Sequence, residues 1–126
     1  MTSLSVDAQI ENPDDQESRF AIAKLTVDRK SHYSWLSESQ LAQIGIEAEG
    51  KVVEFREADG SIIRRRLGMV IVRVHDKFAV DEVVFAEADD TCRLGQGTLD
   101  RLNLVIDPGG KHLVPSGPKP LSMTSC

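Results

Sequence analysis

The main pattern along this chain is a series of short segments in which apolar and polar residues alternate. Residues 4–10 place Val6, Ala8 and Ile10 at every second position, which is typical of a strand with one buried face. An Asn-Pro-Asp sequence at 12–14 favours a turn inside a polar loop, and a returning strand follows over residues 19–27. The chain is therefore expected to open with a β-hairpin.

Further strands follow, separated by turn signals. Asp59-Gly60 is the strongest short hairpin signal, and it joins a strand over residues 51–55 to residues 61–74, which form one long strand or two short ones. The remaining strands are expected at 78–85, 104–106 and 111–114, with turns at 75–77 and 107–110 between them.

Two short helices interrupt this β pattern. Ser37 can cap the first, with Gln40 answering it as a capping box, and Gly45 ends it in the position of a left-handed cap. The second is expected over residues 98–103. The sequence thus predicts an all-β domain of short strands with two short helices.

Size and composition narrow the class of protein. A chain of 126 residues suits one domain, expected over residues 1–115, and the Pro- and Ser-containing residues 116–126 are expected to be a flexible tail. A net charge of −5 argues against a nucleic-acid partner. No apolar run approaches the length of a membrane span. Two cysteines without metal-ligand spacing favour a reducing, cytoplasmic location.

Three segments together resemble a known family. The first is an apolar strand ending in Asp28, followed by "YSWL" and a helix ending "QIGI". The second is "EFREADGSIIRRRLG", and the third and most specific is "RLGQGTLDRLNLVIDPGGKHLVP". In this order they resemble the active-site strand, the flap hairpin, and the hydrophobic-Gly segment with its helix and closing hairpin in bacterial retropepsin-like aspartic peptidases.

This resemblance implies a fold and a chemistry. The fold would be the retropepsin-like closed barrel, with Ala58, Asp59 and Gly60 at the tip of a flap. Two subunits would pair as a homodimer, each contributing Asp28. Two carboxylates about 3 Å apart share one proton, so that one acid is protonated while the other activates the water that attacks a peptide bond. No cofactor or metal takes part in that chemistry.

The residues after Asp28 depart from the family pattern. Arg29 stands where the family has the Thr of Asp-Thr-Gly, Lys30 stands where it has Gly, and Ser31 follows. Arginine cannot supply the hydroxyl that, in the family, holds the two active-site loops together across the dimer interface. Lysine adds a side chain where the family's tight turn has a glycine. In a dimer, these cations would favour ionisation of both carboxylates, and the shared proton would be lost.

Three interpretations of function remain open. The first is a homodimeric retropepsin-like domain with lost or weak peptidase activity, which binds an extended peptide or acts as a scaffold. The alternative is an active aspartic endopeptidase that uses Asp28 from each subunit. The third is a purely structural subunit. From the residues alone, Asp28 could also be a strand-end residue that pairs with Arg29 or Lys30 or caps the local turn. His32 beside it lacks metal-ligand spacing.

Overall fold

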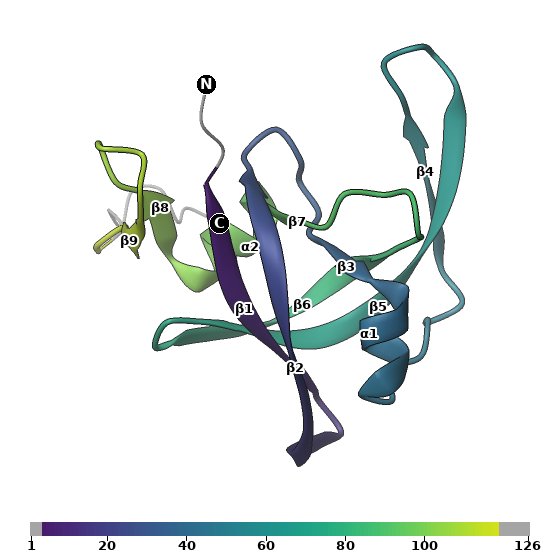
Figure 1. Cartoon of the computed structure of the whole chain (residues 1–126), viewed down its shortest axis with the longest axis horizontal. Helices are drawn as coiled ribbons and strands as arrows, with labels where there is room; N and C mark the ends of the chain where they lie inside the picture. The colour runs from purple at the N-terminus through teal and green to yellow at the C-terminus, as the bar shows by residue number, and fades with distance from the viewer. Residues whose placement is uncertain (1–3, 119–126) are drawn as a thin grey trace, which may run out of the picture.

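The computed structural model describes residues 4–118, without the side chains of residues 16–18. Most of this range is β-strand (Figure 1). Its elements, in chain order, are β1 (Ser5–Asn12), β2 (Asp15–Asp28), β3 (Trp35–Ser37), α1 (Glu38–Gln43), β4 (Val52–Arg56), β5 (Ile62–Val74), β6 (Lys77–Ala86), β7 (Arg93–Gly95), α2 (Gln96–Leu102), β8 (Leu104–Ile106) and β9 (Leu113–Pro115).

Six of the strands close into a barrel. Their order is β1-β2-β7-β3-β6-β5, and β5 pairs back onto β1 to complete the ring. Most pairs are antiparallel, but β2 with β7 and β3 with β6 are parallel. The expectation of an all-β domain with a closed barrel and short helices is confirmed.

The first hairpin is tighter than its sequence suggests. The expected loop over residues 11–18 is largely strand, and only Pro13 and Asp14 form the turn. Asn12 explains this difference, because its Oδ1 accepts the Asp14 N–H at 2.8 Å while its Nδ2 donates to the Ile44 carbonyl at 2.8 Å. One buried amide therefore closes the turn and fastens the hairpin to the end of α1.

The Asp59-Gly60 turn joins β4 and β5 as predicted, and β5 is one continuous strand. Asp59 Oδ1 accepts the Ser61 N–H at 2.8 Å, and Gly60 has φ of 90°, a conformation that favours glycine. β4 pairs with β5 outside the ring of six. β4 and the first part of β5, residues 62–66, form an arm that projects from the barrel (Figure 1).

Two apolar clusters hold these parts together. The larger fills the barrel, and its fully buried members include Ile10, Leu25, Leu36 and Leu94. The smaller lies where the arm leaves the barrel, and consists of Trp35, Leu67, Val84 and Ala86 with Tyr33, Val53, Phe55, Ile63 and Cys92 packed against them. The arm is thus anchored at its base by apolar contacts.

Both predicted helices exist. Ser37 caps α1 by accepting the Gln40 N–H at 3.4 Å, but the Gln40 side chain donates to the Ile22 carbonyl instead of completing a capping box. Gly45 has φ of 78°, in the left-handed region as predicted. α2 begins two residues earlier than predicted and ends one residue earlier, at Leu102, with Asn103 as its C-cap at φ of 57°.

Two barrel strands went unpredicted. Both β3 and β7 are three residues long, and the sequence pattern predicts no strand over either segment. The hairpin of β8 and β9 forms as expected, as a separate two-stranded sheet.

Of the expected tail at 116–126, Ser116 donates its N–H to the Asn103 carbonyl at 2.9 Å. Residues 119–126 lie outside the described range. Neither helix within residues 4–118 has the length and apolar character needed to cross a membrane.

Candidate functional site

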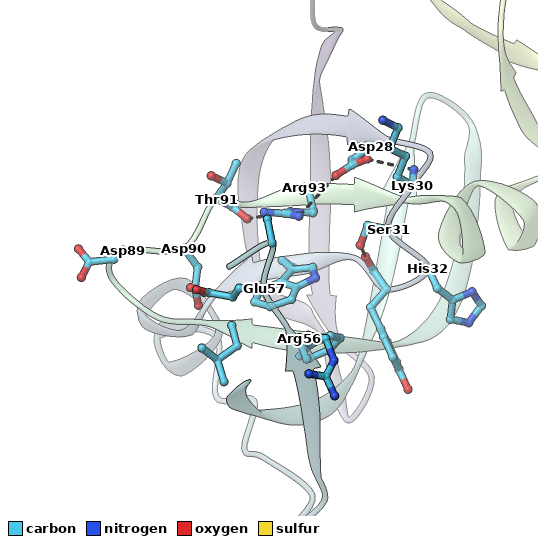
Figure 2. Close-up of a pocket in the computed structure, with 15 residues that line it drawn as sticks. Asp28, Lys30, Ser31, His32, Arg56, Glu57, Asp89, Asp90, Thr91 and Arg93 are labelled. Atoms are coloured by element: carbon cyan, nitrogen blue, oxygen red, sulfur yellow. Dashed lines mark hydrogen bonds and ion pairs between the residues drawn. The ribbon is translucent and has the colours of Figure 1, made fainter. Parts of the chain in front are cut away.

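A tight turn after β2 holds Asp28 at the edge of a cleft (Figure 2). Asp28 Oδ1 accepts the backbone N–H of Lys30 at 3.0 Å, and the Asp28 carbonyl accepts the N–H of Ser31 at 3.2 Å. Ser31 Oγ donates to the Tyr33 carbonyl at 2.7 Å. An aspartate that binds the backbone two residues on is common turn chemistry. The interpretation that Asp28 caps its local turn is confirmed.

The chain after this turn lies directly on the start of α2. The Gly97 N–H donates to the His32 carbonyl at 3.0 Å. A Cβ added at Gly97 would lie 2.8 Å from that carbonyl oxygen, and one added at Gly95 would overlap the Tyr33 carbonyl. The two glycines therefore allow a close backbone approach, which fixes the loop after Asp28 against β7 and α2.

A buried network of hydrogen-bonded polar side chains supports the loop after Asp28. Ser34 Oγ accepts the Gly95 N–H at 2.9 Å and lies 2.5 Å from Thr98 Oγ1, which donates to Asp81 Oδ2 at 2.6 Å. Arg101 Nε lies 3.1 Å from Asp81 Oδ1. Because Ser34 and Thr98 are at most 1% exposed, loss of one partner would leave a buried polar group unsatisfied. This network links the loop after Asp28 to β6 and α2.

The cleft has a volume of about 680 Å³ and lies between the Asp28 turn and the β4–β5 arm (Figure 2). Aromatic rings form its floor: Phe55 contacts Trp35 with ring centroids 4.9 Å apart and Tyr33 with centroids 5.9 Å apart. The lining residues are Asp28, Lys30, Ser31, His32, Tyr33, Trp35, Phe55, Arg56, Glu57, Ala58, Ile63, Asp89, Asp90, Thr91 and Arg93. An apolar floor with charged edges suits a ligand that has both characters.

The Asp28 carboxylate forms an ion pair with an arginine on β7. Arg93 Nη1 lies 3.4 Å from Asp28 Oδ2, and both side chains are about a third exposed, at 30% and 32%. The Arg93 guanidinium also lies over the Trp35 ring, 5.2 Å from its centroid. The parallel pairing of Thr26 with Arg93 and of Asp28 with Gly95 places this arginine beside the aspartate.

A second aspartate–arginine pair lies at the other end of the cleft. Arg65 contacts Asp90 through two bonds of 2.6 and 2.9 Å, and their side chains are only 13% and 12% exposed. Asp90 also accepts the Glu87 N–H at 2.8 Å. Arg65 holds the pKa of the Asp90 carboxyl below its ordinary value, and the Glu87 N–H lowers it further.

The sequence-predicted residues divide among three places. Asp28, Lys30, Ser31 and Ala58 line the cleft, and Arg29 lines a neighbouring cavity that begins at the same turn. Asp59 and Gly60 lie at the tip of the arm and do not line the cleft. There the Ser61 hydroxyl and N–H donate to the Asp59 carboxylate and lower its pKa.

Sequence reasoning missed Arg93, the residue that pairs with Asp28. The expected partners were Arg29 and Lys30, but the Lys30 contact to the Asp28 carboxylate comes from the backbone N–H. One signal was available: Arg93 immediately precedes Leu94-Gly95, in the most specific of the three segments that carry the family resemblance.

The described side chains offer no metal site, since no three His, Cys, Asp or Glu residues within that range are arranged to hold an ion. Burial raises the pKa of the Cys92 thiol, which fits an unreactive cysteine. Comparison with known protein families and with curated protein sequences finds no match to this chain.

Proposed function

We propose that this chain is a retropepsin-like domain that forms a homodimer and binds extended peptides in its cleft, with peptide hydrolysis lost or severely weakened. The observation that carries this proposal is the position of Asp28. It ends a barrel strand at the edge of a 680 Å³ cleft, yet its carboxylate already contacts Arg93 and the Lys30 N–H.

The arrangement of segments supports the family assignment. β2 ends at Asp28 in parallel register with Leu94-Gly95, and α2 begins at the next residue. The β4–β5 arm, which the resemblance assigns as a flap, lines the cleft through Phe55 and Ala58. Elements far apart in the sequence thus meet around one aspartate, as the resemblance implies.

The charges around Asp28 support loss of hydrolysis. A shared proton between two facing aspartates requires carboxylates that are not already paired with cations. Here Arg93 contacts Asp28 directly, while Arg29 and Lys30 add two more positive charges next to it. The sequence anticipated only the last two.

An extended peptide is the ligand that best fits the cleft. The aromatic floor accepts apolar side chains, and within the described range β4 pairs with β5 alone, so its other edge can pair with a ligand backbone. The homodimer follows from the resemblance, since half of the family's site lies on each subunit. A cytoplasmic location remains part of the proposal, from the cysteine content alone.

The test is to incubate the purified chain with a mixed peptide library between about pH 4 and pH 7, measuring both cleavage and retention of uncleaved peptides. We expect retention without turnover, and a dimer by light scattering. Asp28→Asn is compared with Asp76→Asn, a matched change at an exposed turn outside the cleft.

Two outcomes would change the proposal. Cleavage that Asp28→Asn abolishes and Asp76→Asn preserves would establish the active endopeptidase instead. Absence of both cleavage and retention would contradict a peptide-binding role. A gain of cleavage in the double variant Arg29→Thr, Lys30→Gly would support decay from a working enzyme.

A further inference from the structure

A second cavity lies next to the cleft and carries a different charge. Its volume is about 750 Å³, and it is lined by Thr26, Val27, Asp28, Arg29, Lys30, Thr91, Arg93 and Ile106. It shares Asp28, Lys30, Thr91 and Arg93 with the cleft, so the two form one continuous surface around the Asp28 turn. A ligand lying in the cleft can therefore extend into it.

The charge of this second cavity opposes that of the chain. Three cations, Arg29, Lys30 and Arg93, line it against the single carboxylate of Asp28, although the whole chain has a net charge of −5. A local cluster of positive charge attracts an anion.

Two of these cations are available to a ligand. Within residues 4–118, the Arg29 guanidinium and the Lys30 ammonium make no ion pair, and both residues are exposed. Asp28 is committed to Arg93 and to the Lys30 backbone N–H, so it does not neutralise them through a direct contact. The turn places Lys30 on the lining of both cavities and Arg29 on the lining of the second.

We propose that Arg29 and Lys30, with Arg93 beside them, form a carboxylate-binding subsite, so that the peptide bound in the cleft is acidic. This inference rests on the proposed peptide-binding function and adds a ligand class to it. The apolar side chains of the peptide lie on the Trp35 and Phe55 floor, and a carboxylate enters the cavity at the cations, where arginine can bind it through two parallel hydrogen bonds.

The test uses an array of apolar peptides, each made in parallel with glutamate, glutamine or lysine at one position and with an amidated C-terminus. We expect glutamate peptides to retain roughly tenfold more protein than their glutamine counterparts at low salt, as a charge-assisted contact implies. Lysine peptides should bind least, and the preference should fall as salt screens the charges. Glutamine peptides with a free C-terminus distinguish a terminal carboxylate from a side-chain one.

The matched variants are Arg29→Gln with Lys30→Gln, and Lys24→Gln with Lys111→Gln, which removes two exposed cations away from both cavities. Only the first pair should abolish the preference, measured within each variant as the ratio of glutamate-peptide to glutamine-peptide binding, and the second pair should keep that ratio. Equal binding of glutamate and glutamine peptides to the unmodified protein would overturn the acidic-peptide inference alone. Failure of every peptide to bind would overturn the proposed function and this inference together.

Discussion

The two ends of the cleft each hold an aspartate beside an arginine, and the two pairs differ in almost every physical respect. Asp90 meets Arg65 through two short bonds with little exposure, and a backbone N–H completes its contacts. Asp28 meets Arg93 through one contact of 3.4 Å, with about a third of each side chain exposed. The first arrangement is that of a structural ion pair, and the second leaves a carboxylate and its neighbours open to a ligand.

The largest effect is expected at the structural pair. Asp90→Asn removes the nearer of the two carboxylates that face the nearly buried Arg65 guanidinium, the other being Glu87 at 3.6 Å, and should lower the free energy of unfolding by about 2 kcal/mol. Chemical denaturation followed by circular dichroism measures this. Arg65→Gln should give a change of similar size. A loss below about 0.5 kcal/mol in both variants would mean that this pair contributes no more than an ordinary surface ion pair.

A smaller effect is expected from pH. Because Arg65 lowers the pKa of Asp90 in the folded state, the unfolded chain binds the proton more readily, and stability rises with pH in this range. The contribution is present above the ordinary carboxyl value near 4, and is lost as pH falls through the lowered folded-state value. When the free energy of unfolding is measured from about pH 6 downward, it should fall less steeply with decreasing pH for Asp90→Asn than for the unmodified protein. Identical curves for the variant and the unmodified protein would contradict the prediction.

The smallest change in stability is expected at Asp28. Asp28→Asn retains an oxygen that can accept the Lys30 N–H, and loses only a single, partly exposed ion-pair contact of 3.4 Å, so the free energy of unfolding should change by less than about 0.5 kcal/mol. The same denaturation experiment measures it. A loss as large as that of Asp90→Asn would remove the distinction between the two pairs and make Asp28 a structural residue.

The features that the sequence predicted are those set by local interactions, and the features that it missed depend on residues far apart in the chain. The long strands have their own alternation, and the arm has its Asp59-Gly60 turn, so both were predicted from local sequence. β3 and β7 are three residues long, too short to show any period, and they exist because they pair with strands distant in the sequence. Their absence from the prediction follows from that dependence.

The same distinction between local and long-range interactions applies to the candidate site. The Asp28 turn is local and was among the alternatives, while Arg93 reaches the site through the register of β2 with β7. No window of sequence around either residue contains the other. Both segments belong to the resemblance, and Arg93 is the first residue of the third one, but its position beside Asp28 depends on a strand register that only the structure shows.

The parallel pairing of β2 with β7 also bears on the order in which the molecule assembles. The Asp28–Arg93 contact spans 65 residues, and β7 fills the place in the ring between β2 and β3. Closing so long a loop is entropically costly and slow compared with forming the antiparallel hairpins β1–β2, β4–β5 and β5–β6. During synthesis or refolding, the cleft is therefore among the last features to form, and a chain that ends before β7 has the arm and the Asp28 turn but no site between them.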